Sequence, residues 1–309
     1  MINILRVFIV LMKHYIQLLR PKDWAKNLFL FIPSFFAGSF FQWPEIELLL
    51  KGFIAFSLFA SSIYIINDYR DIEKDRLHPE KRNRPLVTGK VKKPIASVLC
   101  VALLISAVLL GYSLDHSFRF LFVLSLYFII NLGYSFGLKN IAILDILLLA
   151  SGFVLRVKSG AVITGVDASQ WLIIMTFLLA LFLSIAKRRD DLLLTMATGN
   201  EMRKSMKGYS LDFLNTMMSI FCAIIIVSYI MYTVDGPTLL RLGTHRLYYT
   251  GLFVIAGIMR YLQITFIEEN SGSPTEILYK DRFIQATILL WVASFGFILY
   301  IKNIVFFKP

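Results

Sequence analysis

Residues 46–85 read IELLLKGFIAFSLFASSIYIINDYRDIEKDRLHPEKRNRP, an apolar run that leads directly into a dense group of charged residues. The apolar part, 46–67, is long enough to cross a membrane, because about 20 helical residues span a hydrocarbon layer of ~30 Å. The whole chain is 57% hydrophobic, with a mean hydropathy of +0.69. These values are typical of a helical membrane protein and exclude an ordinary soluble domain.

Apolar runs of similar length recur along the chain and predict an all-α bundle of about nine transmembrane helices. Backbone groups inside lipid must bond within the chain, so these spans are expected to be helical. No change in composition marks a boundary, which predicts one integral-membrane domain over residues 1–309. Residues 1–20 are expected to form an amphipathic helix at the membrane surface. The predicted spans are 24–41, 46–67, 93–113, 117–136, 142–162, 169–187, 211–233, 246–266 and 284–306.

Basic residues are concentrated in alternate loops, as the positive-inside rule requires. With the N-terminus in the cytoplasm, the loops 67–92 and 187–210 face the cytoplasm and are rich in Lys and Arg. The opposite side holds only Lys51, Arg119, Arg241, Arg246, Lys302 and Lys308. This topology explains the net charge of +12, so nucleic-acid binding is not expected.

Three aspartates follow the second span at helical spacing. Asp68, Asp71 and Asp75 fall at i, i+3 and i+7, which places them on one face of a helix. Carboxylates so close together repel one another unless a cation lies among them, and oxygen ligands suit Mg²⁺. The pattern therefore predicts a site for Mg²⁺ carrying a diphosphate, with Asn67 in support. The alternative is a solvated helix end with surface ion pairs.

Basic residues on the same side of the membrane are candidates for binding phosphate groups. Lys81, Arg82 and Arg84 lie in a proline-stiffened loop, although such a loop also serves topology alone. Lys22 and Lys26 share one helical face and are able to reach a common anion. The alternative for that pair is an interfacial anchor together with a neighbouring tryptophan.

The fifth span contains charges that are costly in lipid. Asp145 lies near its cytoplasmic end, where it is able to pair with Lys139 and shape the mouth of a cavity. Arg156 lies eleven residues further on, about 16 Å deeper at 1.5 Å per residue. It is interpreted either as a deep anchor for an anion or as a structural residue.

The sixth span ends in Lys187-Arg188-Arg189-Asp190-Asp191. An acidic and basic cluster thus recurs four spans after the first one. This weak internal repeat suggests two groups of helices facing each other across one cavity.

These residues carry a resemblance to a known family. The N-D-x-x-D-x-x-x-D pattern of 67–75, with nine helices, resembles the UbiA superfamily of intramembrane transferases. One branch, the decaprenyl-phosphate phosphoribosyltransferases, is similar over about residues 18–300. The stretches that carry this similarity include R-P-K-D-W-A-K-N (20–27), the whole of 67–85, Y-S-F-G-L-K-N (134–140), G-F-V-L-R-V-K-S-G-A (152–161) and A-K-R-R-D-D-L (186–192).

The resemblance implies a function and a cofactor. It implies transfer of 5-phosphoribose from phosphoribosyl diphosphate to a polyprenyl phosphate in a bacterial-type inner membrane, with Mg²⁺ on Asp68, Asp71 and Asp75. The oligomeric state stays open, a homo-oligomer included. Substrate phosphates and the cavity mouth would involve Lys22, Lys26, Lys81, Arg82, Arg84, Lys139, Asp145, Arg156, Lys187, Arg188, Arg189 and Asp191.

Two other functions remain open at this stage. Members of the superfamily that transfer prenyl groups carry a second D-x-x-x-D motif where this chain has 187–191, and that spacing is absent here. The departure weakens the alternative of isoprenyl transfer to an aromatic or other small acceptor, and favours phosphoribosyl transfer. A non-enzymatic transporter or lipid-phosphate binding protein is the third alternative.

Overall fold

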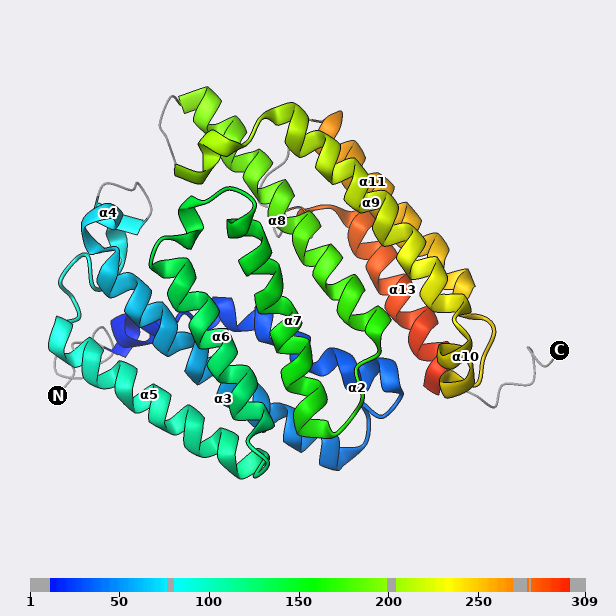
Figure 1. Ribbon diagram of the computed structural model, residues 1–309, viewed down its shortest axis with the longest axis horizontal. Coiled ribbons are helices and arrows are strands. Elements are labelled where there is room, and N and C mark those ends of the chain that lie inside the picture. The colour runs from blue at the N-terminus through cyan, green and yellow to red at the C-terminus, as the bar shows by residue number, and fades with distance from the viewer. Residues whose placement is uncertain (1–11, 77–80, 199–203, 269–276, 278, 301–309) are drawn as a thin grey trace, which may run out of the picture. The chain divides into compact units, whose positions relative to one another are not determined.

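The computed structural model describes residues 12–76, 81–198, 204–268, 277 and 279–300. Every regular element in these ranges is a helix, which confirms the all-α class (Figure 1). Within them, seven helices are long and apolar enough to cross a membrane, and the shorter helix α6 (Arg119–Ser135) is also apolar. The count of nine spans is not confirmed. The seven are α3 (Trp43–Arg70), α5 (Lys93–Leu114), α7 (Leu144–Thr164), α8 (Gln170–Thr198), α9 (Leu211–Val234), residues Leu247–Phe266, and α13 (Arg282–Tyr300).

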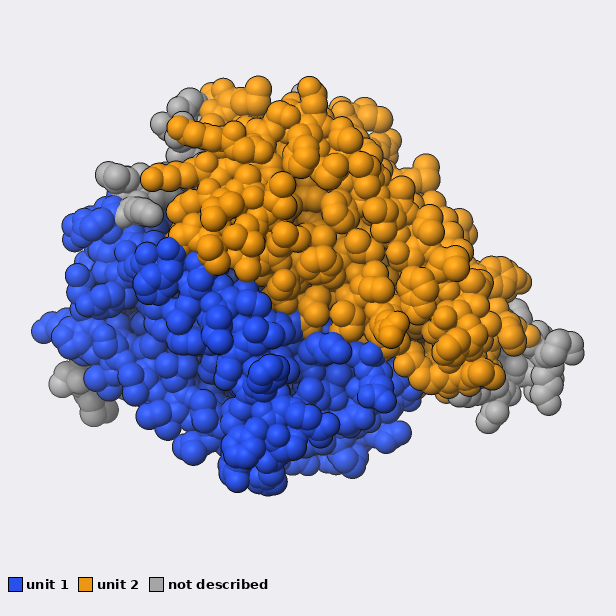
Figure 2. Space-filling view, viewed as in Figure 1, with its two compact units in different colours: residues 1–136, 155–168 blue, residues 137–154, 169–309 orange. Residues whose placement is uncertain are grey.

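The chain divides into two compact units, which Figure 2 shows in blue and orange. Unit 1 comprises Met1–Phe136 and Leu155–Ala168, and unit 2 comprises Gly137–Val154 and Ser169–Pro309. Helix α7 therefore begins in unit 2 and ends in unit 1. Each unit has its own buried apolar core, so each is described separately.

Unit 1 is organised around α3, which packs along α5 and also contacts α6. The core includes Phe56, Phe59 and Ile63 from α3 and Phe120 from α6. Small residues on α3 let other segments approach closely, as is common between membrane helices. One of them, Ser61, accepts a hydrogen bond from Trp24 at 3.0 Å. A segment N-terminal to α3 is thereby held against it.

That segment corresponds to the first predicted span, and it differs from the prediction. In place of one α-helix over 24–41, the chain forms a 3₁₀ helix, η1 (Pro21–Phe31), followed by the six-residue α2 (Ile32–Ala37). Pro33 at the start of α2 lacks a backbone donor and disfavours an α conformation before it. Gly38, with φ 78° in the left-handed region, then ends α2. Of the predicted surface helix 1–20, residues 12–19 are helical and 1–11 lie outside the described residues.

Unit 2 is built from two packed helix pairs, α8 with α9, and α11 (Gly251–Phe266) with α13. Its core includes Phe182, Leu214, Met218, Tyr261 and Ile284. The short elements η3 (Leu138–Asn140), η4 (Lys204–Gly208), α10 (Gly236–Leu242) and η5 (Leu247–Thr250) connect the long helices.

The two predicted cytoplasmic loops contain more helix than expected. Helix α8 continues to Thr198, through the charged stretch that was assigned to the loop 187–210, because Lys, Arg and Leu all favour a helix. The loop 67–92 holds the end of α3, α4 (Ile72–Arg76) and η2 (Lys81–Asn83). Residues 77–80 and 199–203 of these loops lie outside the described residues.

Candidate active site

Asp68 and Asp75 are buried carboxylates that converge on one cation. Asp68 is 2% exposed and Asp75 is 4% exposed. The Nη1 atom of Arg84 donates to Asp68 Oδ1 at 2.9 Å and to Asp75 Oδ2 at 2.5 Å. Since both oxygens contact the same nitrogen, they point at one position in space. Arg20 makes a second ion pair with Asp68.

Arg20 is a residue that the sequence analysis did not assign to the site. It precedes η1 with φ 53° and ψ 59°, a left-handed conformation that is uncommon for a residue with a side chain. Its guanidinium carbon lies 5.2 Å from the centre of the Tyr64 ring. The available signal was its place at the head of the R-P-K-D-W-A-K-N stretch, immediately before Pro21.

The third aspartate of the predicted face occupies a different setting. Asp71 ends α3, with φ −92° and ψ 10°, and its backbone N–H bonds to the carbonyl of Asn67 at 2.9 Å. The break between α3 and α4 interrupts the continuous helix that the i, i+3, i+7 spacing assumed. Across the part of the chain that the structure describes, no three His, Cys, Asp or Glu side chains are grouped closely enough to hold a metal ion.

The end of α3 is fixed to the end of α6. The Ser135 hydroxyl contacts the amide oxygen of Asn67 and also donates to the Asn131 carbonyl at 2.7 Å. Arg70 donates to the Ser135 carbonyl, and its guanidinium carbon lies 3.9 Å from the centre of the Phe136 ring. Asn67 therefore positions the helix end that carries Asp68.

The predicted phosphate-binding lysines of unit 1 are more accessible than its aspartates. Lys26 pairs with Asp23 at 2.6 Å, with 46% of its side chain exposed. Lys22 and Arg82 are exposed, and Lys81 is half-buried. An exposed ion pair of this kind contributes little to stability, so these side chains can change partners at low cost.

Arg156 lies in the interior of unit 1 and is 4% exposed. Its Nε donates to Asn27 Oδ1 at 2.9 Å, and its Nη2 donates to the Tyr127 hydroxyl at 2.8 Å. The guanidinium also lies over the Phe56 ring, 5.3 Å from its centre. One turn further along α7, a Cβ on Gly160 would lie 1.9 Å from the Leu30 carbonyl oxygen. The close approach of η1 to α7 thus brings Asn27 to Arg156.

Unit 2 contains a second buried charge cluster, centred on Asp145 and Arg188, both 0% exposed. Arg188 Nε lies 3.1 Å from Asp145 Oδ2, and Nη1 donates to Asp191 Oδ2 at 2.5 Å. Asp145 also accepts hydrogen bonds from the Tyr209 hydroxyl at 2.6 Å and from the Ser205 hydroxyl at 3.3 Å. Arg188 is a partner of Asp145 that the sequence analysis did not name.

Tyr209 ties the segment after η4 to the start of α7. Its hydroxyl accepts a hydrogen bond from the Ile143 N–H at 2.7 Å. Burial and the hydrogen bond to Asp145 raise the pKa of Tyr209 above its usual value, so it stays a neutral donor. Ile143 has φ 68°, a strained conformation for a β-branched residue. Surrounding contacts must hold such strain in place.

The other residues of unit 2 that were predicted to bind substrate differ in how far they are buried. Arg189 is 5% exposed, donates to Asn215 Oδ1 at 2.7 Å, and lies over the Phe266 ring. Lys187 is exposed, and Lys139 is half-buried in η3. The sequence predicted that Arg188 and Arg189 bind phosphate, and this stays a prediction; in the structure both side chains contact other protein side chains.

Residues 28–283 match the UbiA prenyltransferase family, and the chain belongs to it. It is therefore a transferase embedded in a membrane by several helices. Two similar proteins are called decaprenyl-phosphate phosphoribosyltransferase. The one from Mycolicibacterium smegmatis is 32% identical over 92% of each chain. The one from Corynebacterium glutamicum is also 32% identical, over 93% of this chain and 86% of the relative.

Solved structures agree on the fold. A UbiA homolog from Archaeoglobus fulgidus, bound to GPP and Mg²⁺, superposes with a TM-score of 0.66 at 22% identity, covering 93% of this chain and 99% of the other. A structure of digeranylgeranylglyceryl phosphate synthase gives 0.64 at 16% identity, with coverage of 94% and 99%.

Proposed function

We propose that this protein transfers 5-phosphoribose from phosphoribosyl diphosphate to a polyprenyl phosphate and releases diphosphate. The names of the relatives that match almost the whole chain support this substrate pair. The observation that carries the proposal is the convergence of Asp68 and Asp75 on one cationic position at the end of α3. A buried pair of carboxylates at a membrane helix end is costly and is usually functional.

The residues at this position fit a magnesium ion. Carboxylate oxygens are the ligands that Mg²⁺ prefers, and the two buried ones already point at the same place. In the proposal Asp68 and Asp75 hold the ion, Asp71 is the predicted third ligand although it is not grouped with them in the structure, and Asn67 keeps the helix end in position. When bound, Mg²⁺ would neutralise the charge that builds on the leaving diphosphate.

The protein's own cations do the rest of the electrostatic work. Arg84 and Arg20 lie against the carboxylates, so their guanidinium groups are placed to contact phosphate oxygens as well. Lys81, Arg82, Lys22 and Lys26 are proposed to bind the remaining phosphate groups. The acceptor phosphate is already an anion and needs little help from a general base. Catalysis then consists of positioning and charge stabilisation.

The buried arginines have different proposed roles. Arg156 is proposed to bind an anion deep in unit 1, held by Asn27 and Tyr127. Asp145, Arg188 and Asp191 are proposed to position the end of α8, because Arg188 is fully buried between the two carboxylates. Lys139, Lys187 and Arg189 remain predicted contacts to substrate.

The proposed location is a bacterial-type inner membrane. The N-terminus and the Asp68 region would face the cytoplasm. The distribution of Lys and Arg between alternate loops supports this orientation. A homo-oligomeric state stays a prediction.

A prenyltransferase is the second candidate function, because the matching family is described by that activity. It would use the same cluster of aspartates but would take the lipid as the diphosphate donor. The absence of D-x-x-x-D over 187–191 argues against it.

One experiment separates the two candidates. Purified protein is incubated with Mg²⁺ and either labelled phosphoribosyl diphosphate plus polyprenyl phosphate, or prenyl diphosphate plus 4-hydroxybenzoate. The proposal expects a labelled lipid and diphosphate only in the first incubation. Product only in the second would replace the proposal with prenyl transfer. Binding of substrates without diphosphate release in either would indicate a non-enzymatic role.

A further inference from the structure

Helix α5 ends at Leu114 and α6 begins at Arg119, at the end of unit 1 away from Asp68. Because α5 has 22 residues at ~1.5 Å each, this turn lies about one membrane thickness from Lys93. Its aromatic residues suit a membrane–water interface. The Tyr112 ring lies 5.0 Å from the His116 ring and 5.3 Å from the Phe118 ring, between centres.

Phe118 is held in a strained conformation at this turn. It has φ 61° and ψ 2°, a left-handed conformation that is an outlier for a bulky residue. Its side chain nevertheless stays 59% exposed. Strain of this kind persists only where neighbouring contacts impose it, and it is concentrated at binding sites. The observed outlier directs attention to the adjacent surface.

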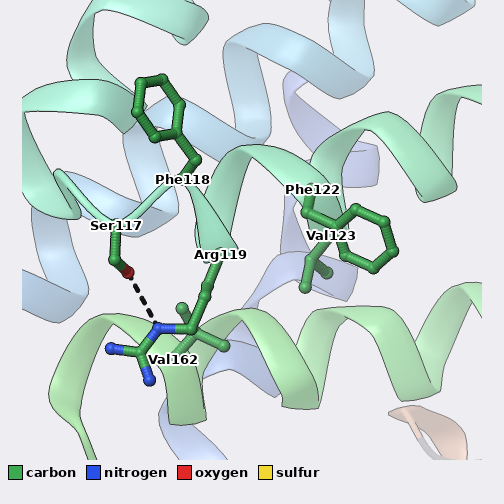
Figure 3. A pocket seen from close by; sticks show the side chains of 6 residues that line it. All are labelled: Ser117, Phe118, Arg119, Phe122, Val123 and Val162. Atoms are coloured by element: carbon green, nitrogen blue, oxygen red, sulfur yellow. Dashed lines mark hydrogen bonds between the residues drawn. The ribbon is translucent and has the colours of Figure 1, made fainter.

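That surface is a groove of about 420 Å³, drawn in Figure 3. Arg119, Phe122 and Val123 line it from one face of α6, at spacings of i, i+3 and i+4. Val162 of α7 lines it from the other side, and Ser117 and Phe118 complete it. The volume is in the range of small-ligand sites, and the lining is apolar apart from Arg119 and Ser117.

Arg119 gives the groove a positive charge at its rim. Its Nε donates to the Ser117 hydroxyl at 2.8 Å, and this hydrogen bond orients the guanidinium (Figure 3). Within the described part of the chain, its two terminal nitrogens have no hydrogen-bond partner. A guanidinium with two nitrogens available matches the oxygens of a phosphate.

The nearby carboxylate of Asp115 makes no direct ion pair with Arg119 in the described part of the chain, although the Ser117 hydroxyl contacts both side chains. Asp115 accepts hydrogen bonds from the Phe120 N–H at 2.9 Å and the Ser117 N–H at 3.0 Å, at the start of α6. Partial burial opposes ionisation, but the hydrogen bonds from Ser117 and Phe120, together with the nearby charge of Arg119, hold the pKa of Asp115 below its usual value. The Asp115 carboxylate therefore binds backbone N–H groups at the start of α6.

We propose that this groove binds one anionic phospholipid, with its phosphate on Arg119 and an acyl chain along Phe122, Val123 and Val162. The proposal is independent of the transferase function, since the groove lies at the opposite end of α5 from the aspartates. The charge of Arg119 favours an anionic headgroup, and the apolar side chains that line the groove bind the acyl chain. Zwitterionic lipids with the same chains are expected to bind more weakly because they carry no net charge.

Native mass spectrometry of the full chain in detergent tests this site. Dioleoyl phosphatidylglycerol is titrated against dioleoyl phosphatidylcholine, and the first bound lipid is counted. Wild type is expected to favour phosphatidylglycerol, and Arg119→Gln to bind it about fivefold more weakly. Arg119→Lys should recover most of that loss. Lys51→Gln is the matched control, because Lys51 is an exposed cation at the same end of unit 1 and pairs with Glu47.

A second variant tests the apolar lining of the groove. Val162→Phe fills the groove and is expected to reduce the first bound lipid for both headgroups, while thermal unfolding confirms that the variant folds. Equal binding of phosphatidylglycerol by wild type and Arg119→Gln would overturn the proposal. So would a first site that prefers phosphatidylcholine, or one that takes polyprenyl phosphate in place of phosphatidylglycerol.

Discussion

Asp68 and Asp75 bind the same guanidinium nitrogen, that of Arg84, at 2.9 Å and 2.5 Å. Both carboxylates are buried, so removing either charge changes the local field at the end of α3 strongly. Asp68→Asn and Asp75→Asn are each expected to lower diphosphate release by at least about 100-fold, since several kcal/mol of charge stabilisation depend on them. Release of labelled diphosphate measures the effect.

Glu73→Gln is the control for that pair, because Glu73 lies on the adjacent α4 with 78% of its side chain exposed. It should keep near-normal turnover. Equal loss in Glu73→Gln and Asp68→Asn would show that charge in this region matters only in a general way, contrary to the proposal.

Asp71→Asn tests whether the third aspartate belongs to the site. The backbone N–H of Asp71 bonds to the Asn67 carbonyl, and this bond survives the substitution. The variant is therefore expected to fold with little change in its unfolding temperature while losing Mg²⁺-dependent turnover. Circular dichroism melting and a magnesium titration of activity provide the two measurements. Turnover at the wild-type level would remove Asp71 from the metal assignment.

Arg156→Lys is expected to lower the free energy of unfolding by about 1–3 kcal/mol, because the lysine cannot serve both Asn27 and Tyr127. Thermal unfolding in detergent measures the loss, and substrate titration shows whether affinity for the anionic substrates falls with it. Lys158→Gln, an exposed position two residues along α7, is the control. An unchanged affinity would assign Arg156 to structure alone.

Gly160→Ala is expected to destabilise unit 1 by about 3 kcal/mol or more, at the upper end of overpacking effects. The new Cβ would meet the Leu30 backbone carbonyl at 1.9 Å, and backbone cannot move aside as a flexible side chain can. Gly296→Ala has no atom within 4 Å of the added Cβ and should melt at or slightly above the wild-type temperature, because alanine favours a helix more than glycine does. Equal melting temperatures for the two variants would refute the close packing of η1 on α7.

The environment of Asp281 leads us to expect that the free energy of unfolding depends on pH. The hydrogen bond from Arg260 lowers the pKa of Asp281, whose Oδ1 also accepts from the Ile284 N–H at 2.8 Å. Because the folded pKa is lowered, the stabilisation is present above the usual carboxyl pKa of about 3.9 and is lost as pH falls through the folded value. Wild type should exceed Asp281→Asn by about 1 kcal/mol at pH 7.

That difference should shrink below about pH 4, as melting curves taken from pH 7 to pH 3 would show. Glu47→Gln, an exposed pair with Lys51, is expected to show no such pattern. A gap that stays constant with pH would contradict the role of the Asp281 carboxylate.

The all-helical membrane class could be predicted from the sequence, because whether a helix lies in lipid depends on the hydropathy of that segment itself. The apolar run 46–67 predicted α3 within a few residues, and the motif beside it predicted the family. The first predicted span failed because apolar composition does not distinguish a 3₁₀ helix from an α-helix. There, the proline and glycine of α2 mattered more than hydropathy.

Partners of buried charges were harder to predict. Spacing on an ideal helix grouped Asp68, Asp71 and Asp75, but α3 ends at Arg70 and the continuous face is lost. Arg20 lies 48 residues before Asp68, and Tyr209 lies 64 residues after Asp145. Contacts over such separations depend on how helices pack, which periodicity does not encode.

The sequence by itself determined that this is an all-helical membrane protein of the UbiA family, because hydropathy and a short charged motif are local properties. Only the tertiary structure decided that Arg84 joins Asp68 to Asp75, that Asn27 and Tyr127 hold Arg156, and that Arg188 is enclosed by two carboxylates. The physical reason is that a buried charge needs a partner, and the chain supplies it from whichever segment packing brings close.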